Sequence, residues 1–116
     1  MTSVLIVDDH PSFRASARAL LEAEGFDVVG EAADGESAIE AAGDLHPDVV
    51  LLDVQLPDVS GFQVASQLTS NGSEVSVVLV SSRDGSDYGP LVEESGARGF
   101  VPKGELTGAR IAALLE

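Results

Sequence analysis

Short apolar runs rich in β-branched residues alternate along this chain with segments in which apolar residues recur at helical spacing. The five runs are Val4–Val7, Val28–Val29 with its neighbours, Val49–Leu52, Val75–Val80 and Phe100–Val101. Most are β-branched and too short for helices, which predicts strands buried on both faces. The first, third and fourth runs give the clearest predictions.

The intervening segments predict five helices. Their markers are Phe13, Ala17, Leu20 and Leu21 with a stop at Gly25; Ala38, Ile39 and Ala42 with an end near Gly43; Phe62, Ala65 and Leu68, entered through Pro57–Gly61 and left at Asn71–Gly72; Leu91 and Val92, beginning at Pro90; and Leu106, Ala109, Ala113 and Leu114. The Gly89–Pro90 pair is expected to shorten or loosen the fourth helix. Alternation of strands and helices predicts an α/β fold whose parallel sheet carries helices on both faces.

Composition narrows the class of protein. A length of 116 residues fits one domain, residues 1–116. Twenty acidic residues against six Lys and Arg give a net charge of −14, which opposes binding to nucleic acid. Cysteine is absent, and no apolar run approaches the roughly 20 residues that span a bilayer. With no signal-peptide pattern at the N-terminus, a cytoplasmic protein without membrane contact is expected.

Polar side chains follow four of the predicted strands. Asp8 and Asp9 come after the first strand, Asp53 after the third, Ser81 after the fourth and Lys103, the only lysine, just past the fifth. In an open parallel sheet the carboxyl ends of the strands share one edge, where the functional crevice lies. These residues are therefore expected to meet in one crevice.

Three neighbouring carboxylates repel one another, and a divalent cation relieves that repulsion. Oxygen ligands without Cys or a nearby His favour Mg²⁺. A bound Mg²⁺ with open positions suits a phosphoryl group, and a carboxylate can attack phosphorus to form an acyl phosphate. Lys103 would then supply a positive charge to the phosphoryl group and Ser81 a hydroxyl donor. The pattern indicates a phosphoryl-accepting site.

Four motifs in order, VLIVDD, LLDVQLPDVSGF, VLVSS and GARGFVPK, resemble the receiver domain of bacterial two-component response regulators. The resemblance covers nearly the whole chain and is strongest for receivers that accompany a helix-turn-helix output domain. It implies a flavodoxin-like (βα)5 fold, a doubly wound five-stranded parallel sheet in the order 2-1-3-4-5.

The resemblance also implies a role for each matching residue. Asp53 would be the phosphoacceptor, and the metal site would comprise Asp8 through a bound water, Asp9 directly, Asp53 and the main-chain carbonyl of Gln55. Ser81 would be the switch hydroxyl, Phe100 the switch aromatic and Lys103 the phosphoryl-binding lysine. The expected partners are a sensor histidine kinase or phosphotransfer protein, with a homodimer through the fourth helix and fifth strand as a further expectation.

Such a receiver takes a phosphoryl group from phosphohistidine with the help of Mg²⁺ and is not a conventional enzyme. One alternative is an interaction module that does not depend on phosphorylation, although its expected signature, a missing acidic pair, acceptor or lysine, is not seen. Another is a small phosphohydrolase, which usually needs an aspartate where Gln55 stands.

Several residues have plainer interpretations. Ser82 is the alternative to Ser81, which strand register favours. We expect His10 to be a surface residue and Asp58 a solvated turn acid. Arg14 and Arg18, one turn apart on the first helix, fit either partner docking or a solvated face. Arg83 is expected to border the phosphoryl group, pair with Asp84 or face solvent.

Overall fold

The computed structural model describes residues 1–70, 74–82 and 88–115. Its five strands are β1 (Ser3–Val7), β2 (Asp27–Ala32), β3 (Val49–Asp53), β4 (Ser76–Ser81) and β5 (Gly99–Pro102). They form one sheet in the order β2-β1-β3-β4-β5, and all four neighbouring pairs are parallel. The predicted fold class and strand order are confirmed.

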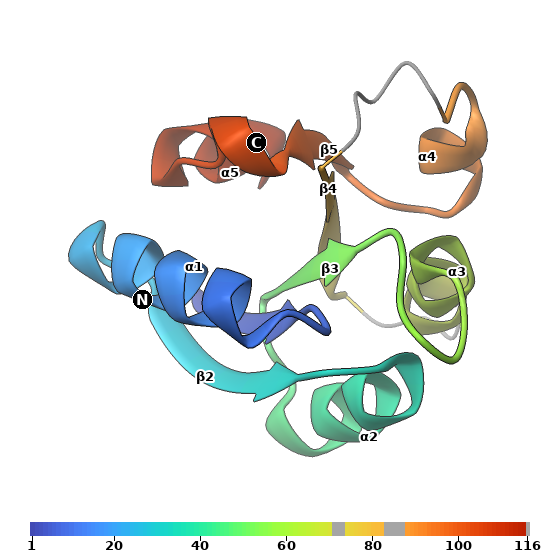
Figure 1. Ribbon diagram of the computed structural model, residues 1–116, viewed down its shortest axis with the longest axis horizontal. Helices are drawn as coiled ribbons and strands as arrows, with labels where there is room; N and C mark the ends of the chain where they lie inside the picture. Colours follow the sequence, from blue (N-terminus) through green and yellow to red (C-terminus); the bar gives the residue numbers. More distant parts are fainter. Residues whose placement is uncertain (71–73, 83–87, 116) are drawn as a thin grey trace.

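Helices cover both faces of the sheet (Figure 1). Helices α1 (Pro11–Ala23) and α5 (Gly108–Leu115) lie on one face, and α2 (Gly35–Leu45), α3 (Gly61–Ser70) and α4 (Leu91–Glu94) lie on the other. Every residue of β3 is buried. Its side chains alternate between two apolar clusters, with Val49 and Leu51 facing α1 and α5, and Val50 and Leu52 facing the other helices. This double burial explains the continuous apolar runs in the sequence.

Two helix ends show how local chemistry sets the boundaries. Helix α1 ends at Ala23, and Gly25 follows with φ +94°, a left-handed conformation that glycine adopts without strain. Helix α2 continues through Gly43 and ends two residues after it. There His46 takes φ 48° and its N–H donates to the Ala42 carbonyl. Pro47 follows, and a residue before proline avoids the right-handed helical conformation.

The last two helices differ from each other in length. Helix α4 has four residues, so the fourth helix is short as expected, and it begins at Leu91 with Pro90 as its N-cap rather than at Pro90 itself. A 3₁₀ turn, η2 (Lys103–Glu105), separates β5 from α5. Leu106, expected within the fifth helix, is buried between η2 and α5 instead. The predicted exit of the third helix at Asn71–Gly72 lies outside the described residues.

Strand register brings the predicted polar residues to one level of the sheet. Val7 lies beside Leu52, Asp53 beside Val80, and Ser81 beside Pro102. The residues that end β3 and β4, and those that follow β1 and β5, therefore meet at one edge. Over the described residues, none of the helices is both long and apolar enough for a bilayer crossing.

Candidate functional site

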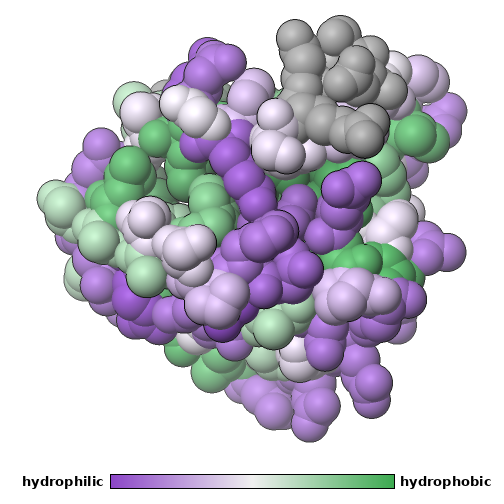
Figure 2. All heavy atoms as spheres, in the orientation of Figure 1, coloured by the Kyte–Doolittle hydropathy of each residue, from purple (hydrophilic) through white to green (hydrophobic). Residues whose placement is uncertain are grey.

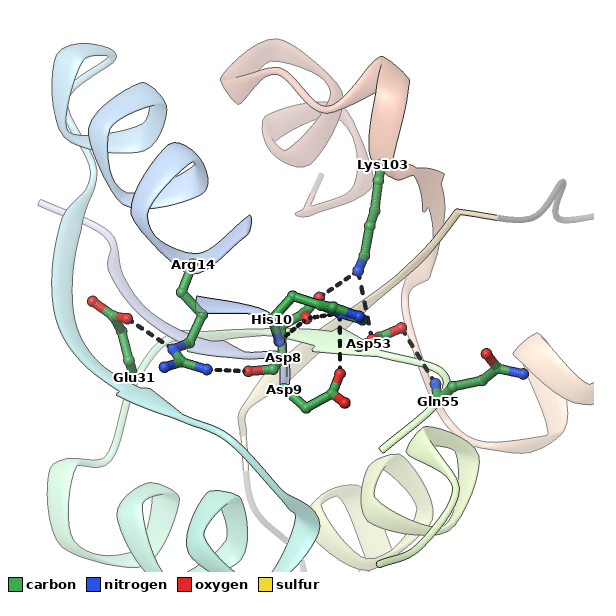
Figure 3. A network of polar contacts seen from close by, with 8 residues as sticks. All are labelled: Asp8, Asp9, His10, Arg14, Glu31, Asp53, Gln55 and Lys103. Carbon is green, nitrogen blue, oxygen red and sulfur yellow. Dashed lines mark hydrogen bonds and ion pairs between the residues drawn. The ribbon is translucent and has the colours of Figure 1, made fainter. Parts of the chain in front are cut away.

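The carboxyl edge of the sheet carries a cleft of about 310 Å³. Five of the predicted site residues line it, namely Asp9, Asp53, Gln55, Ser81 and Lys103. Asp8 is completely buried and joins the same cluster of polar contacts (Figure 3). In the orientation of Figure 1, hydrophilic residues run across the middle of the face in view (Figure 2). The structure thus brings the predicted acids, hydroxyl and lysine together.

Lys103 is the cation of this cluster. Its Nζ lies 2.6 Å from Asp8 Oδ2 and 3.5 Å from Asp53 Oδ2, and 4.5 Å from the centre of the Phe13 ring. The side chain is 17% exposed, so the ammonium faces the two buried carboxylates from the cleft side. The single positive charge of Lys103 is therefore shared by the carboxylates of Asp8 and Asp53.

The acidic residues fit a hard divalent cation. One ligand atom from each of Asp8, Asp9, His10 and Asp53 lies within 4.8 Å of the others. The contact of Lys103 with Asp8 Oδ2 is an ion pair without hydrogen-bond geometry, so this buried oxygen has no hydrogen bond among the described residues. An unsatisfied buried carboxylate oxygen beside two more carboxylates is the donor set that Mg²⁺ prefers.

The electrostatic environment of Asp53 is perturbed by burial. It is 4% exposed, and its burial, together with the Asp8 charge, raises the pKa of its carboxyl group. The Gln55 N–H, which donates to Asp53 Oδ1 at 3.3 Å, and the Lys103 ammonium oppose this rise. Asp53 is thus a shielded carboxylate that opens onto the cleft.

His10 contacts both members of the acidic pair. Its Nδ1 lies 2.9 Å from Asp8 Oδ1 and 3.1 Å from Asp9 Oδ1, and its N–H donates to Asp8 Oδ1 at 2.8 Å. The side chain is 64% exposed, as expected for a surface residue. Sequence reasoning missed the contact with the acids, although the position directly after them was the available signal.

Arg14 holds the main chain of the acidic pair. Its Nη1 donates to the Asp8 carbonyl at 2.6 Å, while its Nε donates to Glu31 at 3.0 Å (Figure 3). Arg18 donates to the other Glu31 oxygen at 2.8 Å, and this hydrogen bond is the main reason that the pKa of Glu31 is lowered. Both arginines are therefore engaged within the domain, and Arg14 belongs to the site.

The loop after β3 is closed by its own main chain. Gln55 forms an isolated bridge with Ser60, and the Gly61 N–H donates to the Val54 carbonyl. Asp58 in this loop accepts hydrogen bonds from the N–H groups of Gly35 and Glu36, which lowers its pKa. The prediction that Asp58 is merely a solvated turn acid was wrong, because this exposed carboxylate caps α2.

At the end of β4 the structure favours Ser81 over Ser82. Ser81 is 3% exposed within the strand, whereas Ser82 is exposed beyond it. Both line the cleft, but the Ser81 hydroxyl also lies 2.8 Å from the Tyr88 hydroxyl, a contact that sequence reasoning missed. Phe100 is half-buried beside Tyr88, with ring centres 5.6 Å apart. Arg83 lies outside the described residues.

Known proteins are similar to this chain in sequence. The family described as the response regulator receiver domain matches residues 4–115. The DNA-binding transcriptional activator EvgA of Escherichia coli K12 is 35% identical over 112 residues, which cover 97% of this chain and 55% of EvgA. The chain spans about half the length of the curated relatives it matches.

Solved structures agree in fold. A two-component response regulator of the LuxR family from Aurantimonas sp. SI85-9A1 has 31% identity and a TM-score of 0.86, covering 99% of this chain and 86% of that one. The CheX–CheY–BeF3–Mg complex of Borrelia burgdorferi has 26% identity and a TM-score of 0.85, covering 98% and 86% of the two chains.

Proposed function

Because this chain belongs to the response regulator receiver domain family, we propose that Asp53 accepts a phosphoryl group from a phosphohistidine donor. The observation that carries the proposal is the position of Asp53 at the floor of a cleft, 3.5 Å from the only lysine and beside two further carboxylates. The same residues would serve poorly as a simple interaction surface, since Asp8 and Asp53 are buried.

In the proposed reaction, a carboxylate oxygen of Asp53 attacks phosphorus and forms the P–O bond of an acyl phosphate. The P–N bond of phosphohistidine breaks, and its electron pair leaves with the imidazole. Lys103 places its positive charge against the phosphoryl oxygens, and the Ser81 hydroxyl donates a hydrogen bond to one of them. This chain thereby assists its own phosphorylation without being a conventional enzyme.

Asp8, Asp9, Asp53 and the main-chain carbonyl of Gln55 would hold Mg²⁺ in this proposal. When bound, the ion would supply positive charge to the equatorial oxygens of the phosphoryl group. The lack of a hydrogen bond at Asp8 Oδ2 and the closeness of the three aspartate carboxylates support this assignment. Arg14 would keep the acidic pair in place through the Asp8 carbonyl.

We further propose that residues 1–116 act as one signalling domain whose phosphorylation shifts a pre-existing equilibrium. The affected surface would be α4 and β5. Phe100 on β5 contacts the Tyr88 ring, and Tyr88 in turn contacts the Ser81 hydroxyl. Leu91 on α4 is 46% exposed, an apolar anchor for a downstream partner or a second copy of the chain. The phosphodonor would be a sensor histidine kinase or a phosphotransfer protein.

The test is intact-mass measurement after incubation with acetyl phosphate, with Mg²⁺ and with a chelator. We expect a single phosphoryl adduct that needs Mg²⁺ and is absent from Asp53→Asn. Asp48→Asn is the matched control, because Asp48 precedes the same strand at its opposite end and binds Ser3 instead. A wild-type chain that binds Mg²⁺ but gains no adduct would favour the phosphorylation-independent interaction module.

A further inference from the structure

Tyr88 shares a hydrogen bond with a hydroxyl that lines the proposed phosphoryl site. Its hydroxyl oxygen lies 2.8 Å from Ser81 Oγ, and either oxygen can donate. Ser81 lines the cleft with Asp53 and Lys103, whereas Tyr88 is not among the lining residues. Tyr88 is therefore placed to act on the site through Ser81.

Aromatic contacts fix the ring of Tyr88. Its centre lies 5.4 Å from that of Phe62 on α3, at 68°, and 5.6 Å from that of Phe100 on β5, at 55°. Edge-to-face and tilted arrangements of this kind are favourable for aromatic pairs. Phe62 and Phe100 have no hydroxyl, and Tyr88 is the only tyrosine in the chain. It alone can connect this aromatic cluster to Ser81 by a phenolic hydrogen bond.

Donation from the Tyr88 phenol, one of the two possible directions of this bond, would orient the Ser81 proton. A serine hydroxyl has one proton to donate and two lone pairs that accept. When the Tyr88 phenol donates to a lone pair of Ser81 Oγ, the Ser81 proton points away from Tyr88. An accepted hydrogen bond also polarises the hydroxyl and strengthens its own donation.

Resting on the function proposed above, we propose that Tyr88 is a positioning residue that orients the Ser81 hydroxyl for donation to a phosphoryl oxygen. The relay runs from the Tyr88 phenol through Ser81 to the phosphoryl group. Phosphorylation strengthens this relay, because an anionic acceptor strengthens both the hydrogen bond from Ser81 and the one from Tyr88 to Ser81. Because the Tyr88 ring contacts Phe62 and Phe100, a change at the phosphoryl site would also affect α3 and β5.

A double-mutant cycle tests the relay. Tyr88→Phe keeps the ring between Phe62 and Phe100 and removes only the hydroxyl, and Ser81→Ala removes the partner. We expect Tyr88→Phe to slow Mg²⁺-dependent phosphorylation by acetyl phosphate about fivefold, the effect of one neutral hydrogen bond. In the Ser81→Ala background the same substitution should change the rate less than twofold. Equal effects in both backgrounds, or none in wild type, would overturn the proposal.

Tyrosine fluorescence gives a second readout that a merely structural role would not move. The chain has no tryptophan and one tyrosine, so the signal comes from residue 88 alone. Phosphorylation should change this fluorescence in wild type and leave it unchanged in Ser81→Ala, with the adduct in each sample verified by mass. A wild type that gains no adduct contradicts the proposed function, whereas an adduct with unchanged fluorescence in wild type contradicts the relay.

Discussion

Arg14 donates a 2.6 Å hydrogen bond to the main-chain carbonyl of Asp8, and so α1 holds the peptide that joins the two members of the acidic pair. Glu31 on β2 fixes the guanidinium from its other side at 3.0 Å. The Arg14 side chain is only 18% exposed, so this bond is sheltered from water. Arg14 thus stands behind the proposed metal ligands, where supporting hydrogen bonds commonly set ligand geometry.

Replacing Arg14 with methionine should therefore weaken Mg²⁺ binding about tenfold, a typical effect for a residue that supports metal ligands. Titration calorimetry with Mg²⁺ measures the change. Arg18→Met is the matched control, because Arg18 pairs with the same Glu31, whereas it is Arg14 that donates to the Asp8 carbonyl. Equal losses in the two variants would show that Glu31 and the overall charge, rather than the Asp8 carbonyl, determine the effect.

Lys103→Met should destabilise the Mg²⁺-free protein by about 2 kcal/mol, since it leaves two buried carboxylates without their shared cation. Methionine retains the apolar contact with the Phe13 ring. Millimolar Mg²⁺ should restore more stability to this variant than to wild type, because the ion then has no competing ammonium.

Urea unfolding in chelator and in Mg²⁺ measures both effects of Lys103→Met. Arg110→Met is a suitable control, because Arg110 pairs with Glu105 at an exposed position outside the cleft. An equal gain from Mg²⁺ in wild type and Lys103→Met would contradict a shared site for the ammonium and the metal.

The sequence predicts best those elements that have a repeated apolar pattern, because the pattern determines where each strand begins and ends. The runs at β1, β3 and β4 predicted strands because both faces are buried, and the ends of these strands then placed Asp8, Asp53 and Ser81 at one edge. The role of Asp58 could not be predicted in this way. Its hydrogen bonds reach Gly35 and Glu36, which lie 23 and 22 residues away in the sequence.

Tyr88 illustrates the same limit at the site itself. A single tyrosine beyond the strand end has no periodic context, and only the tertiary fold brings its hydroxyl to Ser81. Helix α2 ends near Gly43, as predicted, but Gly43 is not the residue that ends it. Gly43 lies within the helix, and a Cβ added there would contact no other atom. The helix ends instead at His46, which precedes Pro47.

The pH dependence of stability should reflect the raised pKa of Asp53. Burial makes the folded protein hold this proton more tightly than the unfolded chain does. Between the ordinary carboxyl pKa and the raised one, the unfolded state binds fewer protons, so the free energy of unfolding falls as the pH rises. Asp53→Asn should remove this fall and, in chelator at pH 7, increase stability by about 1 kcal/mol, an ordinary size for one substitution.

Unfolding in urea from pH 3 to pH 8 checks the sign for Asp53→Asn. Asp48→Asn should act in the opposite direction, because hydrogen bonds from Ser3 lower the pKa of Asp48 and its contribution is lost as the pH falls. If the free energy of unfolding changed with pH in the same way for wild type and Asp53→Asn, Asp53 would not be the group whose raised pKa causes the fall.

Gly61 begins α3 directly against the strand that carries Asp53. A Cβ at this position would lie 2.2 Å from the Asp53 carbonyl oxygen and 2.8 Å from Val54 Cα. Both neighbours are main-chain atoms that cannot turn aside. Gly61→Ala must therefore displace the loop after β3 and should cost about 2 kcal/mol or more in the free energy of unfolding.

The displacement should also affect phosphorylation and metal binding, because Gln55 lies in this loop and Asp53 directly precedes it. We expect Gly61→Ala to lower both the yield of the aspartyl phosphate and the Mg²⁺ affinity. Gly43→Ala is its matched control. Gly43 lies inside α2 with no atom within 4 Å of the added methyl, so the change should stabilise the helix by about 0.5–1 kcal/mol. If Gly61→Ala had wild-type stability, the loop after β3 could move without cost. The close packing of Gly61 would then not be what holds Asp53 in place.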